Sequence, residues 1–194
     1  MPFEVEIKAL IGPDPAGGTD SDTPRGLTES DRIEAEIARI CEFRKEFRKK
    51  DIYYHIPGDP DPTSFRIRDD TGTPVVTYKN KTMAGNAEVN EEHEFTVSDE
   101  GEFRGLISLM GAGEVIRKEK RGKAYRYGDL TVEVCTVAGL GRFVEVEALL
   151  DSADKAGDSI GKIREFLARV GIREEQICKR YYIDMLMEAS RSFP

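Results

Sequence analysis

The chain has 194 residues, of which 39% are hydrophobic and 34% are charged, and its net charge is −8. This length fits one large domain, residues 1–194, with a sizeable core. The negative charge argues against a nucleic-acid partner, because phosphates attract basic surfaces. No run approaches the roughly 20 apolar residues of a membrane span, so we expect a cytoplasmic protein that makes no membrane contact.

The N-terminal part predicts a strand, a loop and a helix. Between Met1 and Leu10, apolar and charged residues alternate with a period of two, which is typical of a strand. Residues 12–27 are rich in Pro and Gly and predict a mobile loop insertion. Thr28 and Asp31 fit a helix cap, and the helical spacing of the apolar residues that follow predicts about three turns.

The remainder of the chain alternates short strand-like runs with turns. Seven more strands are predicted, which makes eight in all: Phe43–Ile56, Ser64–Asp69, Val75–Lys81, Glu91–Val97, Val115–Arg121, Leu130–Thr136 and Phe143–Leu149. Helical spacing predicts a short helix between Asp99 and Gly113, a longer one from Ile160 to Val170, and a last one over Glu174–Glu188.

Charged residues occupy alternate positions of several predicted strands and therefore share one face of each. The pairs or triplets are Glu4, Glu6 and Lys8; Arg66 and Arg68; Lys79 and Lys81; Glu92 and Glu94; Lys118 and Lys120; and Glu145 and Glu147. An antiparallel sheet with its charged face in water would show this pattern. Its repetition on so many strands also fits a closed barrel with a charged interior. Basic pairs suit phosphate oxygens and clustered carboxylates suit Mg²⁺ or Mn²⁺, so a metal–polyphosphate complex would need both.

Six segments, spread over nearly the whole chain, match the motifs of one family in their order. They are Glu4-Val5-Glu6-Ile7-Lys8, an ExExK signature; Asp51-Ile52-Tyr53-Tyr54; Phe65-Arg66-Ile67-Arg68; Thr77-Tyr78-Lys79; the segment LGRFVEVE from Leu140 to Glu147; and Tyr182-Ile183-Asp184-Met185-Leu186. The chain thus resembles the CYTH superfamily, the triphosphate tunnel metalloenzymes, and within it the class IV adenylyl cyclases. The resemblance implies an α+β fold, an eight-stranded antiparallel closed β-barrel with helices packed outside.

The resemblance also implies roles for the charged residues. Catalytic residues would be Glu4, Glu6 and Lys8. The ligands of Mg²⁺ or Mn²⁺ would be Glu4, Glu6, Glu92, Glu94, Glu145 and Glu147, with Glu133 as a substitute ligand. The substrate would be bound by Lys8, Arg66, Arg68, Lys79, Lys81, Lys118 and Lys120, with Arg121 or Lys123 as an alternative second basic residue of the last of these strands.

Two positions depart from the family pattern. Cys135 stands where an Asp is usual, which is why Glu133, two residues earlier on the same face, is included among the ligands. A nucleophilic role for Cys135 and a buried structural thiol are both open, and the buried thiol is the more frequent of the two. Asn90 stands where the family has an Arg, which removes one phosphate contact.

The resemblance implies a divalent-metal-dependent enzyme that acts on a triphosphate. The first expectation is a conversion of ATP to cyclic AMP and pyrophosphate, as in class IV adenylyl cyclases. A triphosphatase that hydrolyses inorganic, thiamine or nucleoside triphosphate would use the same residues. A polyphosphate- or nucleotide-binding module without catalysis is the alternative from another functional class. Many barrels of this family pair up, so a homodimer is a further expectation.

Overall fold

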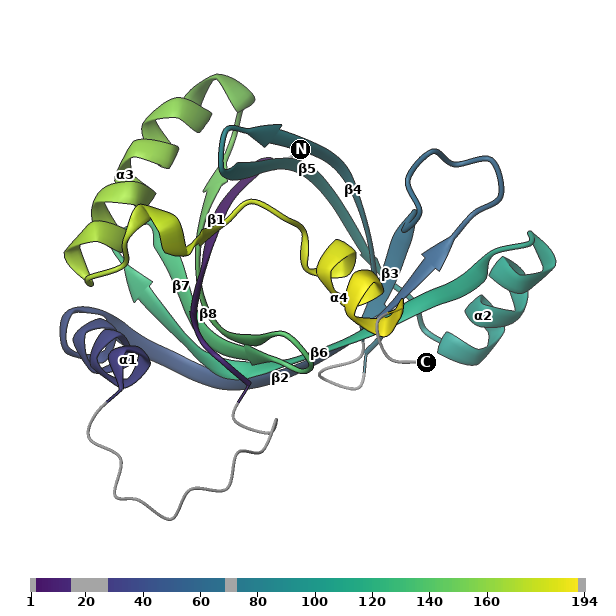
Figure 1. The fold of residues 1–194 in the computed structure, drawn as a ribbon. Helices are drawn as coiled ribbons and strands as arrows, with labels where there is room; N and C mark the ends of the chain where they lie inside the picture. The colour runs from purple at the N-terminus through teal and green to yellow at the C-terminus, as the bar shows by residue number, and fades with distance from the viewer. Residues whose placement is uncertain (1–2, 15–27, 69–72, 192–194) are drawn as a thin grey trace, which may run out of the picture.

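The computed structural model describes residues 3–14, 28–68 and 73–191, and a closed antiparallel β-barrel lies at its centre (Figure 1). The strands are β1 (Phe3–Gly12), β2 (Glu42–His55), β3 (Phe65–Arg68), β4 (Val75–Ala84), β5 (Ala87–Thr96), β6 (Gly113–Tyr127), β7 (Leu130–Val137) and β8 (Gly141–Leu150). They follow the order β5-β4-β3-β2-β6-β7-β8-β1, and β5 pairs back onto β1. The predicted eight-stranded closed barrel is confirmed.

The first strand closes the barrel with two different partners along one edge. Residues 3–6 of β1 pair with β5, whereas residues 8–9 pair with a two-residue strand, β9 (Ile177–Cys178). β9 therefore occupies the part of the edge that β5 does not reach. This matters because an unpaired strand edge leaves backbone N–H and C=O groups without partners.

The C-terminal segment differs from the prediction of one helix over Glu174–Glu188. A 3-10 turn spans Glu174–Gln176, β9 follows, and the helix α4 begins only at Tyr182 and ends at Arg191. Pairing with β1 gives residues 177 and 178 strand partners that lie 168 and 170 residues away in the sequence, and this tertiary contact overrides the local helical pattern.

Three other helices match their predictions: α1 (Glu29–Ile40), α2 (Glu100–Leu109) and α3 (Ala156–Arg169). At the start of α1, the Thr28 hydroxyl accepts a hydrogen bond from the Asp31 backbone N–H at 3.2 Å, and the Asp31 carboxylate accepts one from the Thr28 N–H at 3.0 Å. This is the predicted capping arrangement. Most of the predicted loop insertion, residues 15–27, lies outside the described part of the chain.

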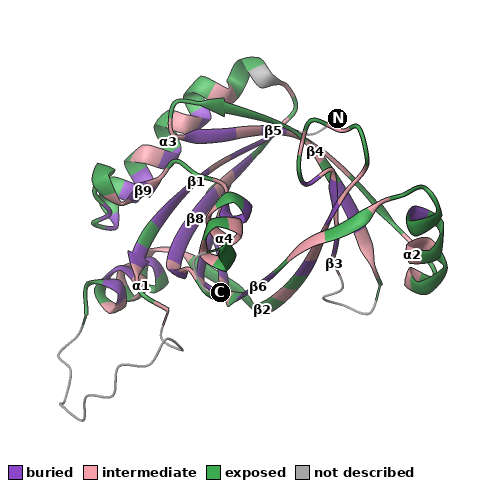
Figure 2. Ribbon diagram, turned by 45° about the vertical axis from the view of Figure 1, so that its right-hand side comes forward, coloured by how far each residue is buried: buried purple, intermediate pink, exposed green. Residues whose placement is uncertain are grey.

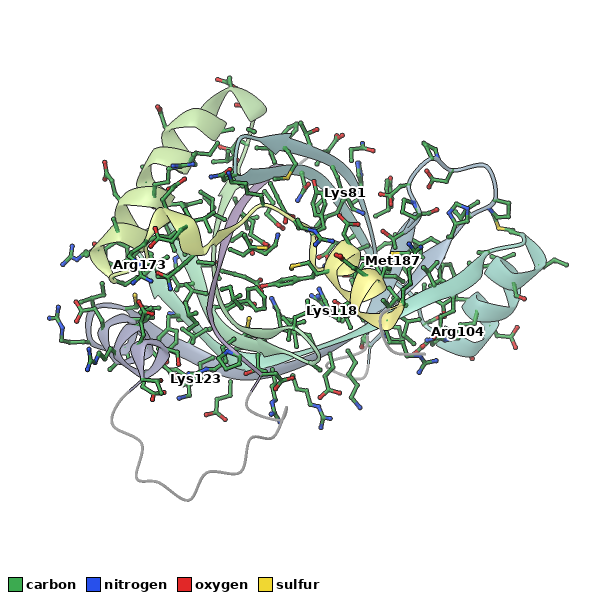
Figure 3. The ribbon with its side chains drawn as sticks, in the orientation of Figure 1. Lys81, Arg104, Lys118, Lys123, Arg173 and Met187 are labelled. Carbon is green, nitrogen blue, oxygen red and sulfur yellow. The ribbon has the colours of Figure 1, made fainter. Side chains whose placement is uncertain are left out.

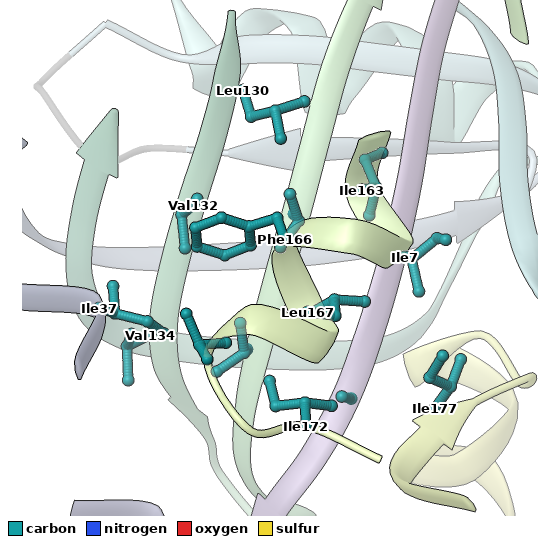
Figure 4. Close-up of a cluster of buried hydrophobic side chains, with 14 of the residues drawn as sticks. Ile7, Ile37, Leu130, Val132, Val134, Ile163, Phe166, Leu167, Ile172 and Ile177 are labelled. Carbon is teal, nitrogen blue, oxygen red and sulfur yellow. The ribbon is translucent and has the colours of Figure 1, made fainter. Parts of the chain in front are cut away.

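The main hydrophobic core lies outside the barrel, between its wall and the helices α1 and α3 (Figure 4). Alternate residues of β1, β7 and β8 point into it and are at most 5% exposed: Val5, Ile7, Val132, Val134, Val144 and Val146. They pack with Ile37 of α1 and with Ile163, Phe166 and Leu167 of α3. Since successive residues of a strand face opposite sides, this outward apolar face directs the charged residues of the same strands into the barrel.

α4 lies at the barrel opening (Figure 2). Its first residues, Tyr182 and Ile183, line the interior cavity together with the preceding Tyr181. The Tyr182 ring packs edge-on against Phe143 of β8, with 4.8 Å between ring centroids. The C-terminal helix thus contributes directly to the interior cavity.

Candidate active site in the barrel interior

All eight barrel strands contribute charged side chains to one interior cavity. The charged residues that line it are Glu4, Glu6, Lys49, Arg66, Arg68, Lys79, Lys81, Glu88, Lys118, Lys120, Glu133, Glu145 and Glu147. Figure 3 shows Lys118 inside the barrel and Lys123, on the same strand, outside it. The closed-barrel interpretation of the charged faces therefore describes the structure better than a sheet with its charged face in water.

One side of the cavity carries an excess of positive charge around Asp51 of β2. Arg68 donates two hydrogen bonds to this carboxylate, at 2.6 and 3.0 Å, and Lys118 lies 3.1 Å from it. Arg66 approaches the same carboxylate at 3.8 Å. Burial acts to raise the pKa of Asp51, but the three cations outweigh it and hold the pKa well below its usual value. Arg66 also lies 3.2 Å from Glu92 and 3.6 Å from Glu94, so it is Arg68 and Lys118, which share Asp51, that leave positive charge for a ligand. Arg is suited to bind phosphate oxygens bidentately.

A second cluster joins β2, β6, β7 and β8. Lys120 lies 2.7 Å from Glu133 and 2.5 Å from Glu145, while Lys49 lies 2.6 Å from Glu133. The Tyr182 hydroxyl donates to Glu145 at 2.7 Å. Burial acts to raise the pKa of Glu145, but Lys120 and the hydroxyl hold it below its usual range. In this cluster the opposite charges offset one another.

The third group, Glu4 and Glu6 of β1 with Glu147 of β8, has too little positive charge nearby. Glu6 and Glu147 are direct neighbours across the two strands. Burial, followed by repulsion from Glu4 and Glu6, raises the pKa of Glu147 to about 8. Burial also raises the pKa of Glu4 to about 7, although Lys79 lies 3.1 Å away, and it raises the pKa of Glu6. These carboxylates repel one another, and a cation would relieve that repulsion.

The donor atoms of this group fit a hard divalent cation. Carboxylate oxygens are the ligands that Mg²⁺ and Mn²⁺ prefer. Among the described residues, no three acidic, His or Cys side chains converge closely enough to hold an ion in their present rotamers. The chemistry of Glu4, Glu6 and Glu147 therefore fits a metal, and ligation requires these side chains to turn toward one another.

The remaining predicted residues occupy the cavity wall or its rim. Glu92 of β5 lies 3.2 Å from both Arg66 and Lys79, and Glu94 accepts a hydrogen bond from Thr77 at 2.8 Å with half of its side chain exposed. Lys8, which is 2% exposed, is paired with Glu88 of β5. Lys81 reaches Asp61 at 2.8 Å. Glu92, Glu94 and Lys8 are not part of the cavity lining, and each is bonded to a neighbouring side chain.

The suggestion that Arg121 could bind substrate is wrong. On β6, Lys118 and Lys120 face inward, and Arg121 lies on the outer side, where it borders a separate groove with Glu34 and Arg142. Strand alternation is the physical reason, because residues one position apart point to opposite faces.

Several cavity residues were missed in the sequence. Lys49 and Tyr53 line the cavity from the same face of β2 as the buried Asp51. Asp51 and Tyr53 stand in one of the matched motifs, but none of the three was given a role, although the same alternation could have indicated one. Burial acts to raise the pKa of Tyr53, but Lys118 outweighs it and lowers the pKa. Glu88 was missed because β5 begins at Ala87, four residues earlier than predicted, after a turn in which Gly85 has a φ of 65°.

Cys135 is a buried thiol inside the barrel. It is 3% exposed, and its Sγ lies 3.3 Å from a carboxylate oxygen of Glu145. Burial and this carboxylate raise the pKa of Cys135 well above its usual value. Because the thiolate is the nucleophilic form, this environment favours a structural thiol over a nucleophile.

Comparison with protein families agrees with this architecture. Residues 28–182 match the CYTH domain. The chain belongs to the CYTH domain family. The matched range contains seven of the eight barrel strands, and β1 with Glu4 and Glu6 precedes it.

Individual proteins are similar to this chain in sequence or in fold over most of its length. A Methanocaldococcus jannaschii protein, provisionally named an adenylate cyclase, is 27% identical over 163 residues, which cover 82% of this chain and 93% of that protein. A Pyrococcus horikoshii structure has a TM-score of 0.77 at 23% identity, covering 95% of this chain and 98% of the other. A Vibrio parahaemolyticus structure, also provisionally named an adenylate cyclase, has a TM-score of 0.71 at 15% identity. The match covers 95% of this chain and 97% of the other. No helix among the described residues is both long and apolar enough to cross a membrane.

Proposed function

We propose that this CYTH protein is a divalent-metal-dependent enzyme that acts on a triphosphate, and specifically that it converts ATP to cyclic AMP and pyrophosphate. The observation that carries the proposal is the charge distribution in one closed interior. Arg68 and Lys118 share one carboxylate, Asp51, and leave positive charge beside it, while the carboxylates of Glu4 and Glu147 in the same interior have too few cations. The names of two relatives support adenylyl cyclase as the specific activity.

The proposed roles follow from the side-chain chemistry. Arg66, Arg68, Lys79 and Lys118 would bind phosphate oxygens and orient the triphosphate along the barrel. Glu4, Glu6 and Glu147 would hold Mg²⁺ or Mn²⁺, which when bound would neutralise charge on the phosphate oxygens. Lys8, fixed by Glu88, would keep a positive charge next to these carboxylates. Burial of all these groups strengthens each charge interaction relative to water.

The decisive experiment is product analysis. Purified protein is incubated with ATP, thiamine triphosphate or inorganic triphosphate, each with Mg²⁺ or Mn²⁺, and the products are separated by chromatography. We expect cyclic AMP and pyrophosphate from ATP, and a loss of at least about 100-fold in rate when Glu4 and Glu6 are both changed to Ala. Glu165→Ala, on the exposed face of α3, is the matched control and should keep the wild-type rate.

Each other outcome identifies a different function. Orthophosphate without a cyclic product would show a triphosphatase, because water rather than a ribose hydroxyl would then be the nucleophile. Tight binding of a triphosphate without any product, under both metals, would show a binding module. Either result would overturn the cyclase assignment.

A further inference from the structure

Asn90 of β5 is buried in the interior with its amide group unused. The residue is 1% exposed and lines the cavity. It lies opposite Glu4 on β1 and opposite Lys81 on β4. Among the described residues, neither its Nδ2 nor its Oδ1 has a hydrogen-bond partner. Both the donor and the acceptor of this side chain are therefore available inside the barrel.

Such an amide is unusual in a folded protein. The large majority of buried side-chain polar atoms have a hydrogen-bond partner, because leaving a buried donor or acceptor unpaired destabilises the fold. An amide that is unpaired on both sides and faces a cavity is explained if a ligand supplies the missing partners. Asn is also uncharged, so it neither adds to nor offsets the charges of the surrounding carboxylates and lysines.

The two halves of the amide require different ligand atoms. Nδ2 can donate to a phosphate oxygen, and Lys79 and Lys81 on the adjacent strand β4 place positive charge for phosphates on the same side of the barrel. Oδ1 can only accept, and an ionised phosphate offers it no hydrogen. A ligand that satisfies both atoms must carry a hydroxyl or amino donor close to its phosphates. Inorganic triphosphate has no such donor, whereas the ribose of a nucleoside triphosphate has hydroxyl groups beside the phosphate chain.

We propose that Asn90 is a specificity-determining residue that accepts a hydrogen bond from a ribose hydroxyl and so favours nucleoside triphosphates over inorganic triphosphate. This inference rests on the proposed function, since it names the substrate class of the same site. Asn90, a neutral side chain on β5, would then distinguish nucleoside triphosphates from inorganic triphosphate, whereas the cations of the cavity would bind either.

The test compares three ligands and three variants. The dissociation constants of ATP, 2′,3′-dideoxy-ATP and inorganic triphosphate are measured by titration calorimetry with Mg²⁺. Asn90→Ala should weaken the binding of all three ligands, because each loses the hydrogen bond from Nδ2 to a phosphate oxygen, and it should weaken ATP binding about tenfold more than the other two, because only ATP also loses the hydrogen bond from its ribose hydroxyl. Asn80→Ala is the matched control, because Asn80 lies on the exposed outer side of β4, where it donates to Glu91, and all its constants should equal those of the wild type.

A third variant tests whether the amide is unpaired before the ligand binds. Asn90→Leu keeps the number of side-chain heavy atoms and the branch at Cγ without polar atoms, so we expect it to raise the Tm of the ligand-free protein while weakening ATP binding as Asn90→Ala does. A lower Tm would show that the amide is already bonded and would overturn the proposal.

Two further results would contradict this role of Asn90. Equal weakening of ATP and inorganic triphosphate by Asn90→Ala would show that it contacts phosphates alone. Unchanged binding of all three ligands would show that it contacts none. Failure of the proposed function is read separately, because the wild type and Asn80→Ala would then form no cyclic AMP from ATP with Mg²⁺ or Mn²⁺, whatever the three dissociation constants are.

Discussion

Asp51 shows how one side chain organises the charges inside the barrel. Its carboxylate is fully buried and is shared by Arg66, Arg68 and Lys118, which come from two different strands. Without it, three cations would face one another in a closed space. Removing one partner of a buried ion pair leaves an unpaired buried charge, and the loss in folding free energy is far larger than the stabilisation that an exposed ion pair provides.

Asp51→Asn should therefore lower the free energy of unfolding by about 3–5 kcal/mol, measured by urea unfolding at pH 7. The matched control is Asp158→Asn in the exposed first turn of α3, which should cost less than about 1 kcal/mol. Equal costs for the two variants would show that the cations around Asp51 do not depend on its charge.

The same residue predicts how stability depends on pH. The pKa of Asp51 is lowered in the folded state, so its contribution is complete above the pKa of the unfolded chain, about 3.9, and is lost as pH falls through the lower folded value. The difference in unfolding free energy between wild type and Asp51→Asn should thus be constant from about pH 7 to 5 and shrink below about pH 4. A difference that already shrinks between pH 7 and 5 would contradict the lowered pKa.

At the scale of elements, the contact between β6 and β7 depends on a glycine. A Cβ atom at Gly122 would lie 2.2 Å from the carbonyl oxygen of Val134 and 2.7 Å from the Cα of Cys135. Both are backbone atoms, so the two strands would have to separate. The neighbouring residues Lys120 and Glu133 form an ion pair across these strands, and separation would change the cavity as well.

Gly122→Ala should lower the free energy of unfolding by about 1–3 kcal/mol, the usual cost of overpacking. Gly161 in the middle of α3 is the matched control, because nothing lies within 4 Å of the Cβ position there. Gly161→Ala should raise stability by about 0.5–1 kcal/mol, since Ala favours a helix over Gly. Thermal unfolding of both variants checks this, and Tm shifts of the same sign would contradict the steric argument.

At the scale of the whole molecule, the antiparallel pairing of β1 with β8 places the carboxylates of the two strands side by side in the barrel interior. Glu147 makes no ion pair with any residue that the structure describes, and Glu4 and Glu6 repel it. The closed barrel therefore carries an electrostatic cost in the metal-free state. A bound cation would remove this cost, so binding of a metal ion should stabilise the folded protein.

Glu147→Gln should raise the stability of the metal-free protein by about 1 kcal/mol or more at pH 7, because the buried Glu147 must either stay charged among repelling carboxylates or take up a proton on folding, and Gln does neither. It should also reduce the increase in Tm that Mg²⁺ produces in the wild type, because one carboxylate ligand is lost. Differential scanning fluorimetry with EDTA and with Mg²⁺ measures both effects, with Glu165→Gln on α3 as the control. A destabilised Glu147→Gln protein, or an undiminished effect of Mg²⁺, would exclude Glu147 from the metal site.

The sequence by itself determined which face of each strand is charged. Alternation in Glu4-Val5-Glu6-Ile7-Lys8 placed the three charged residues on one side, and the same rule places His93 outside, where it stacks on Tyr78 with 4.5 Å between ring centroids. It also separates Arg121 from Lys118 and Lys120, so the error at Arg121 came from not applying the alternation to every residue. These features are local, since they depend only on the geometry of a single strand.

The tertiary structure alone decided which of these charges meet. Lys8 is paired with Glu88, 80 residues away, whereas Glu147 has no ion-pair partner in the described part of the chain, although both lie on the charged faces of their strands. Residues 177–178 form β9 for the same kind of reason, because the free edge of β1 offers them partners. Strand order and register set these distances, and a periodic pattern within one segment carries no information about the register of another.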